Sequence, residues 1–268
     1  MTIVDAHCHV SEGWYEPVES VLHQMERHGV GHAVLVQMQG QFANEYQFDC
    51  VRRYPGRFAP VVLVDTSRED ASTELERLAD AGASGVRLNA ATRSPGADPL
   101  GIWRTAARLR LPVSCAGTAA EFAAPAFSEL VSAVPGLTIV LEHLGSINQP
   151  DRDDATRSDR GRAFELARFP NILMKVPGLG EFCPRRSPTG GPIPFAQPEP
   201  PLLDVAIAAF GPRRLMWGSD FPPVSAREGY GNALNLPRDR IAALPGVTPD
   251  DIARILGGTA LSVFPVRG

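Results

Sequence analysis

Two histidines and an aspartate alternate near the start of the chain, in the stretch VDAHCHV that holds Asp5, His7 and His9. Residues two apart on a β-strand share a face, so this spacing predicts that Asp5, His7 and His9 point the same way. Imidazole and carboxylate groups gathered on one face can bind a metal ion or exchange protons with a substrate. An H-x-H sequence also occurs on ordinary surfaces, so the rest of the chain must decide.

Further polar residues lie in later strand-like runs of the chain. They are Arg87 and Asn89 in the run 84–90, Cys115 in 111–117, His143 in 137–145, Lys175 in 171–179 and Asp220 in 214–222. Each also has a structural interpretation. Arg87 could pair with an acid at the rim, Lys175 could extend outward between helices, and Cys115 could be a small buried apolar residue.

These runs belong to a regular alternation of strand and helix patterns. The remaining strand-like runs are 2–9, 32–38 and 58–65, and helical patterns follow each run up to 248–264, where Thr248 is an N-cap and Pro249 lies in the first turn. Such alternation implies parallel pairing, and eight units in 268 residues match a (β/α)₈ TIM barrel of about 250 residues. A doubly wound sheet is the alternative, but the chain has no G-x-G-x-x-G or Walker A sequence. We therefore predict one barrel domain over 1–268.

A barrel brings the polar residues together. Active sites of this fold lie at the carboxyl ends of the strands, and His7, His9, His143 and Asp220 all fall at that end. The other histidines are His23, His28 and His32, in or just after the first helical pattern. We interpret those three as surface or helix-end residues.

Composition excludes several classes of function. A formal net charge of −4 argues against a nucleic-acid surface, and no apolar run reaches the roughly 18 residues of a membrane span. The N-terminus lacks a signal-peptide pattern, and the four cysteines form no C-x-x-C sequence. These features predict a cytoplasmic protein with free thiols.

Several of these motifs carry a resemblance. D-x-H-x-H in the first run, EHLG in the sixth, ARFPNILMKVPGL around the seventh and FGPRRLMWGSDFP in the eighth resemble the amidohydrolase superfamily. The closest likeness is to its amidohydrolase-related branch, with L-fuconolactonase-like and 2-pyrone-4,6-dicarboxylate lactonase-like hydrolases and non-oxidative decarboxylases, and it covers nearly the whole chain. The resemblance implies that His7 and His9 are the metal-ligand pair, that Asp220 is a metal ligand, the general base or both, and that His143 polarises or protonates the reacting group.

One departure concerns the metal. Metal-binding members often add a lysine or histidine ligand from the fourth or fifth strand, whereas this chain offers Arg87 and Cys115 there. Three protein ligands and water still suffice for a catalytic zinc. We therefore expect a divalent metal, zinc first, to be weakly held or absent.

The predicted reaction is attack of water on a carbonyl carbon, with Asp220 as general base. A site without a firmly held metal suits a lactone or activated ester better than an unstrained amide. Arg87 and Lys175 favour a small anionic substrate, because arginine can clamp a carboxylate with two hydrogen bonds. We predict hydrolysis of a carboxylated lactone or related ester. The alternatives are a metal-dependent decarboxylase of the same fold and a non-catalytic binding protein.

Two loops at the same end of the barrel are also candidates for a role in function. Residues 183–201 are rich in proline, and 222–236 follow the last strand. We expect both to be ordered with little regular structure. Asn89, Arg227 and Tyr230 join Arg87 and Lys175 as candidate substrate-binding residues, and Phe195 is a further pocket candidate. A subunit contact through these loops, and hence a homo-oligomer, is the alternative.

Overall fold

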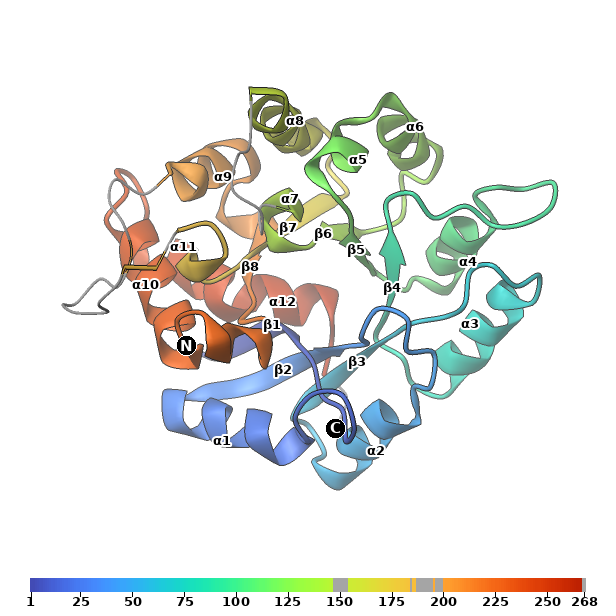
Figure 1. The fold of residues 1–268 in the computed structure, drawn as a ribbon, viewed down its shortest axis with the longest axis horizontal. Helices are drawn as coiled ribbons and strands as arrows, with labels where there is room; N and C mark the ends of the chain where they lie inside the picture. The colour runs from blue at the N-terminus through green and yellow to red at the C-terminus, as the bar shows by residue number, and fades with distance from the viewer. Residues whose placement is uncertain (147–153, 184, 187–194, 196–199, 267–268) are drawn as a thin grey trace.

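Eight parallel strands form one nearly closed barrel in the computed structural model, with helices around it (Figure 1). The structure describes residues 1–146, 154–183, 185–186, 195 and 200–266. The strands are β1 (Ile3–Cys8), β2 (Val30–Val36), β3 (Phe58–Val62), β4 (Gly85–Asn89), β5 (Val113–Ala116), β6 (Ile139–Leu141), β7 (Ile172–Val176) and β8 (Leu215–Trp217), and they are paired in that order. The predicted (β/α)₈ barrel is confirmed.

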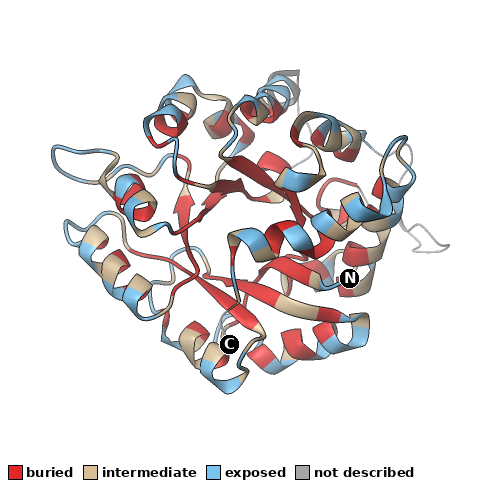
Figure 2. Cartoon of the chain, turned by 180° about the vertical axis from the view of Figure 1, so that it is seen from behind, coloured by how far each residue is buried: buried red, intermediate tan, exposed pale blue. Residues whose placement is uncertain are grey.

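Helices surround the barrel, most of them between successive strands and the last three after β8. They are α1 (Val18–His28), α2 (Glu45–Arg53), α3 (Ala71–Asp80), α4 (Gly101–Leu109), α5 (Ala119–Ala123), α6 (Pro125–Ala133), α8 (Asp154–Phe164), α9 (Leu202–Phe210), α10 (Tyr230–Ala242), α11 (Pro249–Ala253) and α12 (Thr259–Val263). Their barrel-facing sides are buried and their outer sides exposed (Figure 2). Thr248 caps α11 through a capping box and Pro249 lies at its start, as predicted. In the described part of the chain, no helix is long and apolar enough to cross a membrane.

Two apolar layers lie on opposite sides of the strands. Val4, Ala6, Val34, Val140 and Met216 belong to one cluster of buried side chains, which fills the barrel interior. The neighbouring strand residues contribute to two outer clusters beneath the helices. This alternation places a strand residue either inside the barrel or under a helix. Polar side chains that face inward near the carboxyl ends therefore meet one another.

The first and last strands meet at the carboxyl end of the barrel. The amide of Asp220 donates to the carbonyl of His7 over 2.8 Å, and the amide of His9 donates to the carbonyl of Phe221 over 2.8 Å. Gly218 makes this approach feasible, because a Cβ there would lie 2.6 Å from the Cβ of His7. Closure thus brings the end of the first strand and the residues that follow the last strand into one site.

The loop after β8 differs from the sequence-based expectation. Residues 222–236 were expected to have little regular structure, but Pro223–Ala226 form a 3₁₀ turn and α10 begins at Tyr230. The apolar residues Ala233 and Leu234 are buried against the barrel, which stabilises the helix despite Pro237 inside it. Most of the other loop, 183–201, lies outside the described residues. Phe195 is described there and is 1% exposed within the outer core.

Candidate active site

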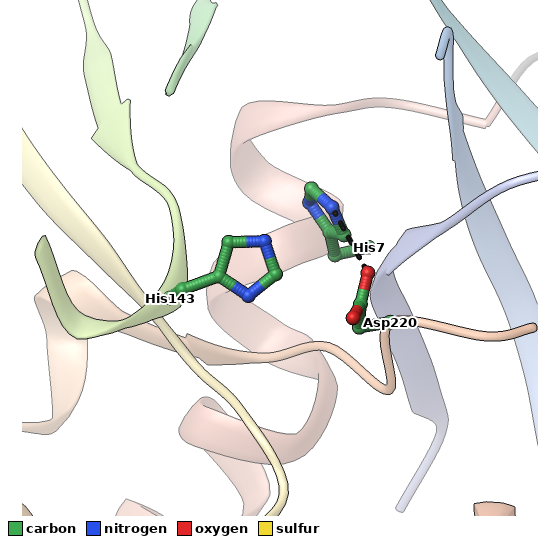
Figure 3. A group of neighbouring side chains, drawn as sticks. All are labelled: His7, His143 and Asp220. Carbon is green, nitrogen blue, oxygen red and sulfur yellow. Dashed lines mark ion pairs between the residues drawn. The ribbon is translucent and has the colours of Figure 1, made fainter. Parts of the chain in front are cut away.

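Three side chains from distant parts of the sequence meet at the carboxyl end of the barrel. His7, His143 and Asp220 each offer one nitrogen or oxygen atom, and these atoms all lie within 4.8 Å of one another (Figure 3). His7 Nε2 lies 3.8 Å from Asp220 Oδ1, and His9 Nε2 lies 3.4 Å from the same oxygen. The predicted convergence of these four residues is therefore present in the structure.

The backbone at two of these residues is unusual. His143 has φ = 49° and Asp220 has φ = 58°, both in the left-handed region. His143 begins the short turn α7 (His143–Ser146), in which Leu144 and Gly145 also have positive φ. Non-glycine residues with positive φ are uncommon and concentrate at functional sites. The turn directs the imidazole of His143 from the end of β6 toward Asp220 and His7 (Figure 3).

A buried polar network lies beneath His7. Lys175 Nζ lies 2.8 Å from His7 Nδ1 and donates to Ser114 Oγ over 2.7 Å. The Ser114 hydroxyl donates to Glu142 Oε1 over 2.6 Å. Arg87 holds the same carboxylate with two parallel hydrogen bonds of 3.0 and 2.7 Å. Arg87 and Lys175 thus have protein partners inside the barrel.

Charge sets the protonation of this network. Burial would raise the pKa of Glu142, but the charges of Arg87 and Lys175 outweigh burial and lower that pKa, so Glu142 is a carboxylate. Burial lowers the pKa of Lys175 to about 8 against the opposing charge of Glu142, so the amine is mostly charged at neutral pH. Burial, reinforced by Lys175, lowers the pKa of His7 well below its usual value. His7 is therefore neutral, and Lys175 donates to its Nδ1, which places the proton on Nε2.

His143 and Asp220 have opposite charges. Burial lowers the pKa of His143, but Glu181 outweighs it and raises that pKa to about 9. Burial would raise the pKa of Asp220, but the hydrogen bond from His9 and the charges of His143 and Arg227 lower it overall. At neutral pH, an imidazolium and a carboxylate therefore face the same space, as an acid and a base.

Comparison with known proteins identifies the family of the chain. The family model Amidohydro_2, described as "Amidohydrolase", matches residues 4–266. The chain belongs to this amidohydrolase family. Among curated proteins it is 28% identical to a 2-pyrone-4,6-dicarboxylate hydrolase of Comamonas testosteroni over 82% of this chain and 76% of that protein. It is also 37% identical to an L-fucono-1,5-lactonase of Burkholderia multivorans, over 37% of this chain and 33% of that protein.

A solved structure shows the same fold. It is an amidohydrolase from Burkholderia multivorans with bound zinc, with a TM-score of 0.76 and 20% identity, covering 99% of this chain and 100% of that one. The family and its lactone-hydrolase relatives make the present chain an enzyme of the hydrolase class. The resemblance seen in the sequence motifs is confirmed.

Two expected substrate-binding residues of this amidohydrolase, and the alternative metal ligand Cys115, make other contacts. Tyr230 is 3% exposed and donates its hydroxyl to Asp5, so it supports the site from behind and does not line a pocket. Asn89 Oδ1 accepts the amide of Ala91 and stabilises the turn after β4. Cys115 packs in the outer core, and burial raises its thiol pKa well above the usual value, so it does not extend the set of metal ligands.

Asp5 also departs from its expected face. Its carboxylate accepts hydrogen bonds from the hydroxyls of Ser219 and Tyr230 at 2.6 and 2.9 Å, in the layer beneath α10. The pairing of β1 with β2 shifts register between Asp5 and Cys8. This irregularity breaks the alternation, so Asp5 and His7 do not share a face as the spacing predicted. Asp5 instead holds β8 beside β1.

Other residues of the site were not singled out from the sequence. Glu142 precedes His143, and Glu181 lies in the GLGEF stretch after β7. A carboxylate next to a strand-end histidine was a usable signal for Glu142.

A tyrosine and a cavity also lie beside the site. Tyr15 is 40% exposed, and the centroid of its ring lies 5.6 Å from the centroid of the His9 ring. A cavity of about 590 Å³ opens nearby, lined in part by Val10, Trp14 and Gln37.

The residues of the site fit a divalent metal. His7 Nε2 is buried and has no hydrogen-bond partner, and it faces Asp220 and His143. Two imidazole nitrogens and one carboxylate oxygen form a donor set typical of catalytic zinc sites. His9, which the resemblance gave as a ligand, lies next to this group, with its Nε2 3.4 Å from Asp220 Oδ1. The protons on His7 and His143 would have to leave before a metal could bind.

Proposed function

We propose that this amidohydrolase hydrolyses lactones by attack of water on the ring carbonyl. The observation that carries the proposal is the pairing of an imidazolium, His143, with a carboxylate, Asp220, across one small space. Hydrolysis of an ester needs a base for water and an acid for the leaving oxygen. Both are present, in the required protonation states at neutral pH.

The proton movements follow from the positions of the side chains. Asp220 Oδ1 accepts a proton from water as the water oxygen bonds to the carbonyl carbon. His7 Nε2–H donates a hydrogen bond to the oxyanion that forms, in a nearly dry site where such a bond is strong. The ring C–O bond then breaks, and His143 Nε2–H gives its proton to the departing alkoxide. The product is a hydroxy acid.

A lactone suits this site for a chemical reason. The residues supply one acid, one base and a neutral hydrogen-bond donor, and an alkoxide that departs from an ester needs less assistance than an amide nitrogen. A bound metal, held by His7, His143 and Asp220, would add Lewis acidity and lower the pKa of its water toward about 7. The two curated relatives, both named for lactone substrates, support the same class.

The carboxylate predicted on the substrate has less support from the site itself. Arg87 is bound to Glu142, and Lys175 to Ser114 and His7, so neither is an open clamp. A carboxylated lactone remains part of the proposal because one relative is named for a pyrone dicarboxylate.

The state of the cysteines supports a cytoplasmic location. The four cysteines are Cys8, Cys50, Cys115 and Cys183; all are buried and none forms a disulfide.

The proposal is tested with a matched lactone panel. Purified protein is incubated with L-fucono-1,5-lactone as the neutral member and 2-pyrone-4,6-dicarboxylate as the charged one, and acid release is followed in a pH-stat. We expect release above background from at least one lactone. Carbon dioxide release from carboxylated phenols, with no lactone opened, would instead favour the decarboxylase, and binding without turnover would favour a binding protein.

We further propose that any metal is held weakly. Lys175 and Arg87 place two positive charges beneath the three ligands, and the Glu142 carboxylate offsets only one of them, so the remaining like charge weakens the binding of a cation. After dialysis against a chelator we expect activity to persist, and zinc added in calorimetric titration to bind only at micromolar or higher concentration. Loss of activity, with recovery at stoichiometric zinc and nanomolar affinity, would contradict the proposal.

A further inference from the structure

A buried chain of ion pairs joins His143 to Asp220 behind the reacting atoms. Glu181 Oε2 lies 2.8 Å from His143 Nδ1, and Glu181 Oε1 lies 3.2 Å from Arg227 Nη2. Arg227 Nη1 donates to Asp220 Oδ2 over 2.9 Å. The chain therefore runs from the acid through Glu181 and Arg227 to the base.

The side chains of His143 and Asp220 are each held through one polar atom, and the other polar atom of each faces the site. His143 contacts Glu181 through Nδ1, which leaves Nε2 for the site. Asp220 contacts Arg227 through Oδ2, while its Oδ1 faces His7 and His9. A hydrogen bond to one ring nitrogen fixes the ring orientation and the role of the other nitrogen. The chain of ion pairs therefore orients His143 Nε2 and Asp220 Oδ1 toward the same space.

Burial restricts the motion of the side chains in this chain of ion pairs. The side chain of Glu181 is 0% exposed and that of Arg227 is 25% exposed. A buried carboxylate is stable only with charged or hydrogen-bonding partners, and His143 and Arg227 supply them. The planar guanidinium of Arg227 can span two carboxylates at once, which a lysine ammonium on a flexible stem cannot do in the same geometry.

Glu228 anchors the arginine to the neighbouring loop. Its Oε1 accepts the amide of Gly180 over 3.0 Å, and its Oε2 lies 3.6 Å from Arg227 Nε. A Cβ at Gly178 would lie 2.7 Å from the Cβ of Ala233 and 3.0 Å from its Cα. A glycine at 178 therefore lets α10 pack closely against the loop after β7.

We propose that Glu181 and Arg227 are positioning residues of this enzyme, Glu181 for the acid His143 and Arg227 for the base Asp220. The inference rests on the proposed lactone hydrolysis. It gives Arg227 a role inside the protein in place of substrate binding. During turnover Glu181 keeps its contact with Nδ1–H while the Nε2 proton moves to the leaving oxygen. The proton held by Asp220 then returns through water to His143, which restores the starting state.

The first experiment compares two leaving groups in the Glu181→Gln variant. The probes are L-fucono-1,5-lactone, whose alkoxide must be protonated, and 4-nitrophenyl acetate, whose phenolate departs without a proton. We expect kcat for the lactone to fall roughly 10²-fold, the lower end of what a general acid supplies, with KM nearly unchanged. The nitrophenyl ester should be affected far less. Glu181→Asp should recover part of the lost lactone activity.

Two further variants separate positioning from simple damage. In Glu228→Gln a neighbouring carboxyl, whose pKa burial raises to about 7, becomes permanently neutral without a change in its distance from His143, and the ratio of the two substrate rates should stay as in the wild type. In Arg227→Lys the base is displaced, so both substrates should slow together. Equal slowing of both substrates in Glu181→Gln, at an unchanged melting temperature, would overturn the role of Glu181 as the holder of the acid.

A spectroscopic measurement makes the test independent of turnover. A histidine Nδ1–H bonded to a carboxylate gives a far-downfield proton resonance, which is expected in the wild type and in Glu228→Gln but not in Glu181→Gln. If no lactone is opened, the proposed function fails while this resonance still reports the His143–Glu181 contact. A resonance that survives in Glu181→Gln would refute the positioning of His143 by Glu181.

Discussion

Replacing Asp220 with asparagine is expected to reduce lactone hydrolysis by about 10²–10⁴-fold, the usual contribution of a positioned general base. The amide keeps the size of the side chain and can still contact Arg227 through its oxygen, but it cannot accept the proton of water. The measurement is kcat/KM by pH-stat, together with a thermal melt to show that the fold is intact.

A matched exposed aspartate controls for the change of charge. Asp239 lies on α10 with its side chain 65% exposed, away from the site residues, so Asp239→Asn should leave hydrolysis unchanged. An Asp220→Asn variant that retained wild-type turnover would remove Asp220 from the mechanism. The proposed base would then have to be sought among the other polar groups of the barrel mouth.

The fold could be read from the sequence because its signals are local. Each strand is a short apolar run, and the helices between them end at glycine or proline, as at Gly29 after α1. The rule that parallel barrels gather function at the carboxyl ends then placed His143 and Asp220 together although they lie 77 positions apart in the sequence. Strand periodicity and topology were sufficient for this part of the site.

The pairing of side chains could not be predicted, because it depends on contacts remote in sequence. Lys175 and Ser114 are 61 positions apart, and Arg87 and Glu142 are 55 apart. The charges of Arg87 and Lys175 were visible, but their internal partners were not, and so both were assigned to the substrate. Asp5 was misplaced for a different reason: a register irregularity in β1 has no signature in the pattern VDAHCHV.

The ion pair between Arg87 and Glu142 provides the largest expected effect on stability. The side chains are 8% and 2% exposed, and two parallel hydrogen bonds join them. Removing one partner of a buried pair leaves an uncompensated charge and typically costs about 3–5 kcal/mol. Arg87→Met should therefore lower the free energy of unfolding by about that amount, measured by urea denaturation.

A double variant distinguishes loss of the charge partner from loss of packing. In Arg87→Met/Glu142→Gln the buried negative charge is gone, while the glutamine oxygen still accepts the Ser114 hydroxyl. Because the penalty in the single variant arises from the stranded carboxylate, the double variant should be more stable than Arg87→Met, and a double-mutant cycle should show strong coupling. If the two changes were additive, or if Arg87→Met unfolded at the wild-type urea concentration, the carboxylate would be stabilised by Lys175 and Ser114 alone. Arg87 would then be free to bind an anionic substrate, as the sequence first suggested.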